Sequence, residues 1–297
     1  MSLLRLIALA AAAGCSSSSD QLANAPAVDS TVAPVAAVLS TDTTDTSDTT
    51  AASETAATAP DSLRVPILVY HNIQPASEAG AVRGADLTMR PEVFAAQMQY
   101  LKDHKIPVVS FGALLDALEG KGSVSPGAVV ITFDDGRVNQ YHNAFPLLKK
   151  LGFPATFFPF THAMNKNPRY FTWAQLHEMQ SAGMSVGSHT SLHVRVDKMK
   201  DPKQMHAEVT GSRTLLGDKL GAAATELFSY PFGALATAGD SAVRASGYRA
   251  ARAYGGGTWN SWGNRWRLRS VPMTENMSRF QQIVNPDGVS ARKAAAP

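Results

Sequence analysis

Two adjacent carboxylates, Asp134 and Asp135, occupy the position in this chain that most clearly suggests chemistry. They end the apolar, β-rich run 129–133 and are followed by Gly136, so the pattern predicts a buried strand that stops at a glycine turn. Burial of one carboxylate there is costly, and burial of two requires a cation or a shared proton. The sequence therefore predicts a cation at this strand end, with Asp135 as the cap of a helix near Val138 as the alternative.

Two histidines, His189 and His193, form the second candidate group. His189 lies just past another short apolar run, and His193 follows four residues later. Two imidazoles and one carboxylate suffice for a metal site that keeps an open position for water or substrate. The second aspartate would then be free to act as a base on the attacking water. A hydrogen-bonded strand-end residue for His189 and a solvent-facing residue for His193 are the alternatives.

These residues are far apart in the sequence, so the elements around them must bring them together. From Leu63 onward, short β-rich runs alternate with helical patterns, which indicates parallel βα units. Helices are predicted at 92–104, 139–151, 173–182 and 202–220, and strands at 65–70, 107–109, 129–133, 156–159, 185–188, 227–230, 248–251 and 267–271. Seven or eight such units in about 220 residues favour one irregular (β/α) barrel, with a doubly wound open sheet as the alternative.

The barrel interpretation agrees with the positions of the candidate residues, because reactive side chains of such barrels lie at the carboxyl ends of strands. Candidate residues follow four of the predicted strands, namely His71, the Asp134 and Asp135 pair, His189, and Pro231. We therefore expect these side chains to meet at one end of a single catalytic domain.

The amino terminus predicts export. Residues 1–14 carry one positive charge and an apolar stretch too short to span a bilayer, as a secretory signal peptide does. Cys15 follows, and Ala12-Ala13-Gly14-Cys15 resembles a bacterial lipoprotein processing site; an ordinary signal that leaves a free thiol is the alternative. We expect a periplasmic or cell-envelope protein held at the membrane by a lipid rather than by a transmembrane helix. A single cysteine excludes a disulfide within the chain.

Composition separates the chain into three further parts. Residues 15–62 are mostly Ser, Thr, Ala, Asp and Pro with no aromatic residue, which is typical of a disordered tether. The domain is expected at 63–285 and a disordered tail at 286–297. The net charge is only +3, and the basic residues are scattered, with Arg265, Arg267 and Arg269 alternating along a predicted strand. Nucleic-acid binding is therefore not expected, and we expect a monomer.

The motifs Thr132-Phe-Asp-Asp-Gly136 and His189-Thr-Ser-Leu-His193 together resemble those of the polysaccharide deacetylases, the carbohydrate esterases that remove acetyl groups from sugars. The resemblance runs from about residue 65 to 271. It implies a polysaccharide substrate, Asp134 as the catalytic base, and Asp135, His189 and His193 as ligands of a divalent metal. Zinc fits this ligand set best, with cobalt or nickel as alternatives.

The segment Phe228-Ser-Tyr-Pro-Phe-Gly233 resembles the third motif of this family, which forms one wall of the groove. The resemblance implies that Tyr230 and Pro231 contact substrate and that the backbone N–H of Phe232 binds the developing oxyanion. Many members carry an arginine, paired with the base, at the position that Ser229 holds here. Arg269 on the last predicted strand is a candidate replacement.

The general acid is expected to be His71. Many family members use a histidine after the last strand, but this sequence has no histidine beyond His206. First and last strands are neighbours in a closed barrel, so a histidine on the first can occupy the same region of space. This arrangement resembles the subgroup that deacetylates poly-β-1,6-N-acetylglucosamine. Peptidoglycan or chitin-oligomer deacetylation, or a non-catalytic sugar-binding module at the cell surface, are the alternatives. The other five histidines are expected to be structural or surface residues.

Overall fold

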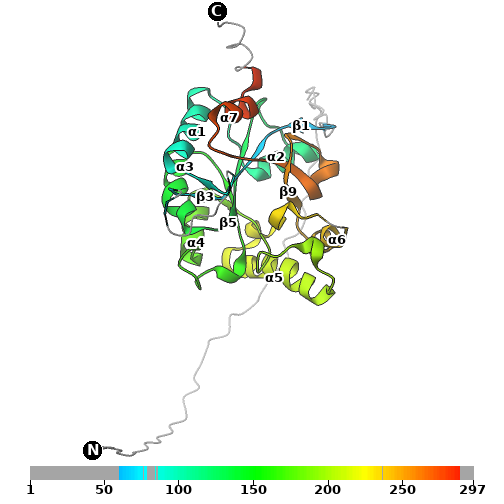
Figure 1. Cartoon of the computed structure of the whole chain (residues 1–297). Helices are drawn as coiled ribbons and strands as arrows, with labels where there is room; N and C mark the ends of the chain where they lie inside the picture. Colours follow the sequence, from blue (N-terminus) through cyan, green and yellow to red (C-terminus); the bar gives the residue numbers. More distant parts are fainter. Residues whose placement is uncertain (1–59, 76, 79–83, 85, 236, 288–297) are drawn as a thin grey trace, which may run out of the picture. The chain divides into compact units, whose positions relative to one another are not determined.

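A computed structural model describes residues 60–75, 77–78, 84, 86–235 and 237–287 (Figure 1). The expected signal peptide, tether and most of the expected tail therefore lie outside the described residues. Seven parallel strands form the main sheet, in the spatial order β7-β6-β5-β2-β11-β9-β8. These strands are β2 (Ile67–Tyr70), β5 (Val130–Asp135), β6 (Thr156–Pro159), β7 (Ser185–Val186), β8 (Leu227–Ser229), β9 (Ala250–Gly256) and β11 (Leu268–Pro272).

The sheet curls into a nearly closed barrel. Its two edges, β7 and β8, meet where Ser188 forms a parallel bridge with Phe228. The Ser188 N–H donates to the Leu227 carbonyl at 2.8 Å, and the Ser229 N–H donates to the Ser188 carbonyl at 2.8 Å. These bonds join the sheet edges, which confirms the barrel and excludes the open doubly wound sheet.

Seven α-helices are described. They are α1 (Pro91–Asp103), α2 (Phe111–Glu119), α3 (Phe145–Leu151), α4 (Trp173–Ser181), α5 (Pro202–Leu220), α6 (Thr237–Ala245) and α7 (Met277–Val284). Helices such as α1, α3 and α4 cover the outside of the barrel. Figure 1 shows α1, α3 and α4 along one side of the strands, with α5 and α6 along another. The helix predicted at 139–151 begins as a π-helical turn, η1 (Gln140–Ala144), before α3.

Side-chain alternation along the strands separates two buried regions. Ile67, Val130, Phe158, Leu227, Ala250 and Leu268 come from six strands and pack together with the apolar face of α2. Residues of opposite parity, among them Leu68, Ile131, Phe133 and Phe157, pack with helices such as α1, α3 and α4. Because successive strand side chains point to opposite faces, the first set lines the barrel interior, and α2 packs against the interior residues of the barrel.

Short elements complete the domain. Two two-stranded pairs stand beside the barrel: β1 (Leu63–Arg64) with β10 (Trp259–Asn260), and β3 (Asn72–Ile73) with β4 (Thr88–Met89). The 3-10 turns are η2 (Thr161–Ala163), η3 (Val196–Lys198), η4 (Ala222–Thr225), η5 (Pro231–Gly233) and η6 (Trp262–Arg267).

Two predictions about strands were wrong. The run 107–109 forms only a single bridge, Val108 to Val129, rather than a strand of the barrel. Arg265 and Arg267 lie in η6, and only Arg269 lies in a strand. A proline at 107 and a capped helix immediately after this run explain the first difference, since Ser110 accepts a hydrogen bond from the Ala113 N–H at 3.1 Å and starts α2.

Candidate metal centre and catalytic pocket

Asp134 and Asp135 both line one pocket of about 400 Å³ at the carboxyl end of β5. Asp134 shares the inward parity of Val130 and Thr132, so it points into the barrel. Asp135 would point outward in a regular strand, but its φ of 73° breaks the alternation. Gly136 continues this left-handed turn at φ 70°, where a Cβ atom would lie 2.6 Å from Cβ of Pro159. The turn therefore lets two adjacent carboxylates reach one site.

Asp135, His189 and His193 form a cluster whose ligand atoms all lie within 4.8 Å of one another. Nε2 of His193 is 3.2 Å from Oδ1 of Asp135, and Nε2 of His189 is 3.7 Å from the same oxygen. Burial raises the pKa of Asp135, but the hydrogen bond with His193 and the nearby imidazoles outweigh burial, and the pKa lies below its usual range. The carboxyl is thus ionised, as a metal ligand must be.

His189 is held in the state that a metal ligand requires. Its Nδ1 lies 2.8 Å from the Ser229 carbonyl oxygen, so Nδ1 carries the proton and Nε2 offers its lone pair toward Asp135. Burial lowers the pKa of His189 to about 4, although the two aspartates act in the opposite direction. The imidazole is therefore neutral near pH 7. Two imidazole nitrogens and one carboxylate fit a divalent metal with an open position.

Arg252 is the cationic partner of Asp134. Its guanidinium is fully buried and donates to Oδ1 of Asp134, and also to Oγ of Ser229 at 2.7 Å. Burial alone would raise the pKa of Asp134, but Arg252, followed by His189 and His71, keeps that pKa below its ordinary value. The prediction that Arg269 replaces the arginine paired with the base was wrong, because the side chain of Arg269 is exposed on β11. Many family members carry an arginine at the position of Ser229. In this chain Ser229 instead accepts a hydrogen bond from Arg252.

His71 enters the same pocket from the end of β2. The residue is 8% exposed, and Nε2 lies 3.9 Å from Oδ2 of Asp134. The ring of Tyr254 packs edge-on against it at 5.6 Å between centroids. The strand geometry behind this placement is confirmed, since β2 pairs in parallel with β11. Asp134 thus lines the same pocket as the metal-ligand cluster and lies beside His71.

The third motif contributes one residue to the pocket rather than three. Phe232 lines it with a left-handed backbone, φ 60°, and its ring lies 4.7 Å from that of His193. The Phe232 N–H donates no hydrogen bond to another described residue. Tyr230 is buried in a separate core cluster, with its hydroxyl 3.4 Å from Asp240, and neither Tyr230 nor Pro231 lines the pocket. The prediction of direct substrate contact therefore finds no support for these two side chains.

Five lining residues were missed by the sequence analysis: Asn72, Asp86, Leu87, Arg137 and Tyr254. The Tyr254 hydroxyl donates to the Asp86 carboxylate. A signal for Arg252 and Tyr254 was available, since both share the parity of the inward-facing Ala250. The predicted strand, however, stopped at residue 251. The remaining four residues lie in loops or in the short pair β3–β4, where no periodicity marks them.

A nearly closed parallel β/α barrel, with two aspartates and two histidines at the carboxyl ends of its strands, is the architecture of a metal-site hydrolase. Residues 121–251 match the family model described as polysaccharide deacetylase. The chain therefore contains a polysaccharide deacetylase domain, as its motifs indicate.

Known proteins with similar sequences carry related names. "Putative polysaccharide deacetylase YxkH" of Bacillus subtilis (strain 168) is 31% identical over 170 residues, which cover 57% of each protein. A poly-β-1,6-N-acetyl-D-glucosamine N-deacetylase of Staphylococcus epidermidis is 32% identical over 117 residues, covering 38% of this chain and 40% of that enzyme. This chain thus spans about half the length of these relatives.

A solved structure matches over most of the domain. The Streptococcus pyogenes deacetylase PplD, solved in complex with acetate, superposes with a TM-score of 0.69 at 25% identity, over 75% of this chain and 99% of PplD. IcaB from Ammonifex degensii superposes with a TM-score of 0.64 at 24% identity, over 74% of this chain and 95% of IcaB. The barrel described above is therefore the fold of these proteins.

Proposed function

We propose that this protein is a metal-dependent N-deacetylase that releases acetate from a β-linked N-acetylglucosamine polymer, with its catalytic domain at residues 63–285. One observation carries the proposal: a buried aspartate, Asp134, shares one pocket with an Asp/His/His ligand set and a histidine. Such a pocket contains a base, a metal-ligand set and an acid, which are the parts that hydrolysis of an unactivated amide requires. A non-catalytic sugar-binding module would not need a base beside a metal site.

Asp135, His189 and His193 would hold the divalent ion, and their two imidazoles and one carboxylate suit zinc, with cobalt or nickel as substitutes. Such an ion supplies a Lewis acid that polarises the acetyl carbonyl and lowers the pKa of the attacking water. The carbonyl of Ser229 fixes the orientation of one ligand through Nδ1 of His189.

Asp134 takes the proton of the attacking water. Arg252 and Ser229 hold its Oδ1, and the lowered pKa keeps the carboxylate ionised. As the C–O bond forms, the backbone N–H of Phe232 donates to the oxyanion. His71 then gives a proton to the sugar nitrogen as the C–N bond breaks, so that the amine and acetate leave as products.

We further propose that the polymer is poly-β-1,6-N-acetylglucosamine. Two observations support this substrate: the proposed acid, His71, directly follows β2, the first strand of the barrel, and the named N-deacetylase of Staphylococcus epidermidis, which is 32% identical over the aligned 117 residues, acts on this polymer by its name. Peptidoglycan and chitin oligomers present the same acetamide, so they belong in any substrate panel.

Acetate release tests the proposal. The purified protein should release acetate from poly-β-1,6-N-acetylglucosamine faster than from chitin oligomers or peptidoglycan. Dipicolinate should abolish release, and added zinc or cobalt should restore it. Full activity in protein shown to be metal-free would contradict the metal assignment, and absence of acetate from every polymer at full metal loading would contradict the enzyme assignment.

For its location, we propose an exported protein attached to the membrane through a lipid on Cys15. The support is the sequence of the first 15 residues, which lie outside the described part. Among the described helices, none has both the length and the apolar character needed to cross a membrane.

A further inference from the structure

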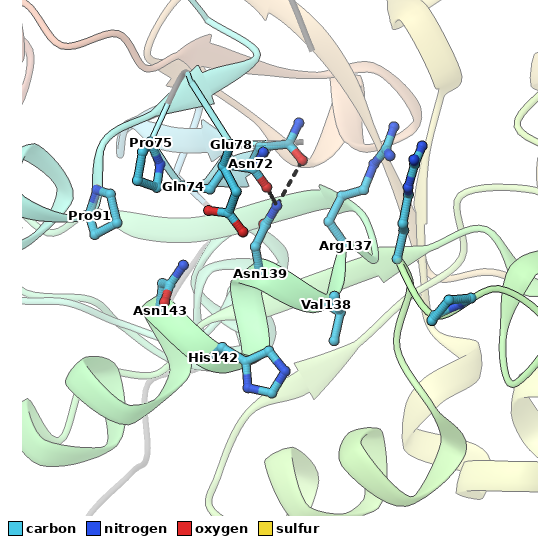
Figure 2. Close-up of a pocket in the computed structure, with 12 residues that line it drawn as sticks. Asn72, Gln74, Pro75, Glu78, Pro91, Arg137, Val138, Asn139, His142 and Asn143 are labelled. Carbon is cyan, nitrogen blue, oxygen red and sulfur yellow. Dashed lines mark hydrogen bonds between the residues drawn. The ribbon is translucent and has the colours of Figure 1, made fainter. Parts of the chain in front are cut away.

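A second pocket, of about 520 Å³, adjoins the catalytic pocket (Figure 2). Asn72 and Arg137 line both pockets, so the two hollows share a wall. A polymer whose reactive sugar occupies the catalytic pocket must place its next sugar nearby. The second pocket is large enough for a ligand of that size.

Three amides form the inner wall of this pocket: Asn72 and Gln74 are buried, and Asn139 is half-buried. Figure 2 shows the side chain of Asn139 joined by dashed lines to those of Asn72 and Gln74. Its Nδ2 donates to Oδ1 of Asn72 at 3.0 Å and to Oε1 of Gln74, while its Oδ1 accepts from the Ile73 N–H at 3.2 Å. The Ile73 N–H can only donate, so it fixes which way the Asn139 amide faces. This in turn fixes the oxygen of Gln74 toward Asn139.

Gln74 therefore keeps a free amide nitrogen. The residue is 4% exposed and lines the pocket, and its Nε2 has no hydrogen-bond partner among the described residues. Buried polar groups are nearly always paired, and an unpaired donor is unfavourable in the absence of a ligand. A carbonyl oxygen is the group that would satisfy it.

The rim of the pocket carries charges of both signs. Glu78 and Arg169 are exposed, and neither forms an ion pair with another described residue. Arg137 stacks on the ring of Tyr170 at 4.7 Å and lies 3.8 Å from Oδ2 of Asp135. Two arginines disfavour an ammonium group in the pocket, and Glu78 disfavours a phosphate. This combination favours a neutral ligand rich in hydroxyl and carbonyl oxygens.

We propose that this amide pocket, formed by Asn72, Gln74, Glu78, Asn139 and Arg169, binds the sugar next to the one being deacetylated and prefers a neighbour that still carries its acetyl group. The proposal rests on the proposed deacetylase function. The Gln74 amide would donate to the acetamide carbonyl, and Glu78 and Arg169 would contact hydroxyls. A neighbour that has lost its acetyl group brings an ammonium toward Arg137 and Arg169. Deacetylation would thus slow as neighbouring sugars are converted, which leaves a partly acetylated polymer.

Chain-length dependence tests the subsite. Acetate release would be measured on the β-1,6-linked N-acetylglucosamine monosaccharide, disaccharide and pentasaccharide, with 4-nitrophenyl acetate as a substrate that needs the catalytic pocket alone. In the unmodified protein, kcat/KM should rise from monosaccharide to pentasaccharide. In Gln74→Met and in Arg169→Met, the ratio of pentasaccharide to ester kcat/KM should fall about 3- to 10-fold, as expected for one lost hydrogen bond.

Gln99→Met is the matched control, because this exposed glutamine on α1 lies outside the pocket and, within the described part of the chain, its side chain bonds to Asp103. Because Arg169 is exposed, Arg169→Met tests the subsite even if Gln74→Met causes a folding defect. Pentasaccharides with one glucosamine beside the reactive sugar should react more slowly, and Arg169→Met should reduce that difference. An unchanged pentasaccharide-to-ester ratio in both variants would overturn the proposal.

Binding separates this inference from the deacetylase function itself. Asp134→Asn protein would be titrated with the pentasaccharide, with and without Gln74→Met. Loss of affinity on the second substitution supports the subsite even if no substrate releases acetate, in which case only the proposed function fails. Equal affinity in both proteins would overturn the subsite while leaving the deacetylase assignment intact.

Discussion

Asp134 and Asp135 are neighbours in the chain but have different partners. Asp134 is bonded to Arg252 inside the barrel, whereas Asp135 lies beside two imidazoles. A single left-handed residue, Asp135 at φ 73°, produces this division. The proposed roles, Asp134 as base and Asp135 as ligand, therefore depend on this backbone turn, and exchange of the two roles would require a different turn.

Substitution of each aspartate should separate these roles. Asp134→Asn should keep near-normal zinc content but lose about 10²-fold or more in turnover, as is usual for a general base. Asp135→Asn should lose zinc, because an amide is a poor substitute for an ionised ligand. Metal analysis beside acetate release checks both. Equal zinc content and retained activity in the two variants would show that the assignment is wrong.

The pair of Asp134 and Arg252 should be coupled in stability. Each charge is buried, and removal of one partner leaves the other unpaired, which typically costs about 3–5 kcal/mol. Arg252→Met alone should therefore lower the free energy of unfolding by about that amount. The double variant with Asp134→Asn should be less destabilised than the sum of the single variants, as urea denaturation in a double-mutant cycle would measure. Additive effects would mean that the two groups do not interact energetically.

The role of His71 depends on the leaving group. His71→Ala should retain zinc and lose about 10²-fold or more in turnover on N-acetyl substrates, because an amine must be protonated as it departs. An activated ester has a leaving group that needs little protonation, so its hydrolysis should fall far less. The two rates are compared in the same preparation. Equal losses would assign His71 to sugar binding or to structure instead.

Some strand ends were predictable from the sequence, and others were not. Apolar runs followed by Asp or His predicted the carboxyl ends of β2 and β5, where His71 and Asp134 lie, whereas β7 ends at Val186, before the predicted end at residue 188. The run that forms β9 was predicted to end at residue 251, although the strand continues to Gly256. The prediction therefore missed Arg252 and Tyr254. A buried arginine is an exception to the apolar pattern of interior strands, so the apolar run stops before it. The position of Arg252 depends on Asp134, about 120 residues earlier, and no local pattern reports such a pairing.

The turn at Gly136 can be tested against a second glycine of the same conformation. Gly136 and Gly152 have φ of 70° and 68°, but only Gly136 has neighbours within 4 Å of an added Cβ. Gly152→Ala should cost about 1–2 kcal/mol for its left-handed backbone alone. Gly136→Ala should cost about 1–3 kcal/mol more for the clash with Pro159, and should also weaken zinc binding because Asp135 belongs to the same turn. Thermal unfolding and zinc titration measure the two effects. Equal destabilisation by both substitutions would argue against a tight turn at the site.

At the scale of the whole molecule, closure of the barrel assembles the site. The backbone of Ser188 forms hydrogen bonds with Leu227 and Ser229 of β8. In the next residue, Nδ1 of His189 bonds to the Ser229 carbonyl. The contacts that join the sheet edges therefore also orient a proposed metal ligand. The sequence predicted a barrel from the number of βα units, but it contained no signal for the bridge between Ser188 and Phe228, which lie 40 residues apart. Metal binding and global stability should consequently be linked, since a ligand that binds only the folded state stabilises it.

We expect a lipid on Cys15 to anchor the domain to a membrane. The apolar stretch before Cys15 is too short to span a bilayer, so stable attachment would depend on the lipid. The full chain should fractionate with membranes and carry an acyl group on Cys15, detectable by mass spectrometry of the amino-terminal peptide. Cys15→Ala, exported correctly, should appear in the aqueous fraction, as should a chain that begins at Pro60, the first described residue. Both should release acetate at the rate of the full chain, because His71 is the first of the described residues that line the catalytic pocket. Membrane association that persists in the exported Cys15→Ala protein would contradict the lipid anchor, since the acyl chain would then be unnecessary for attachment.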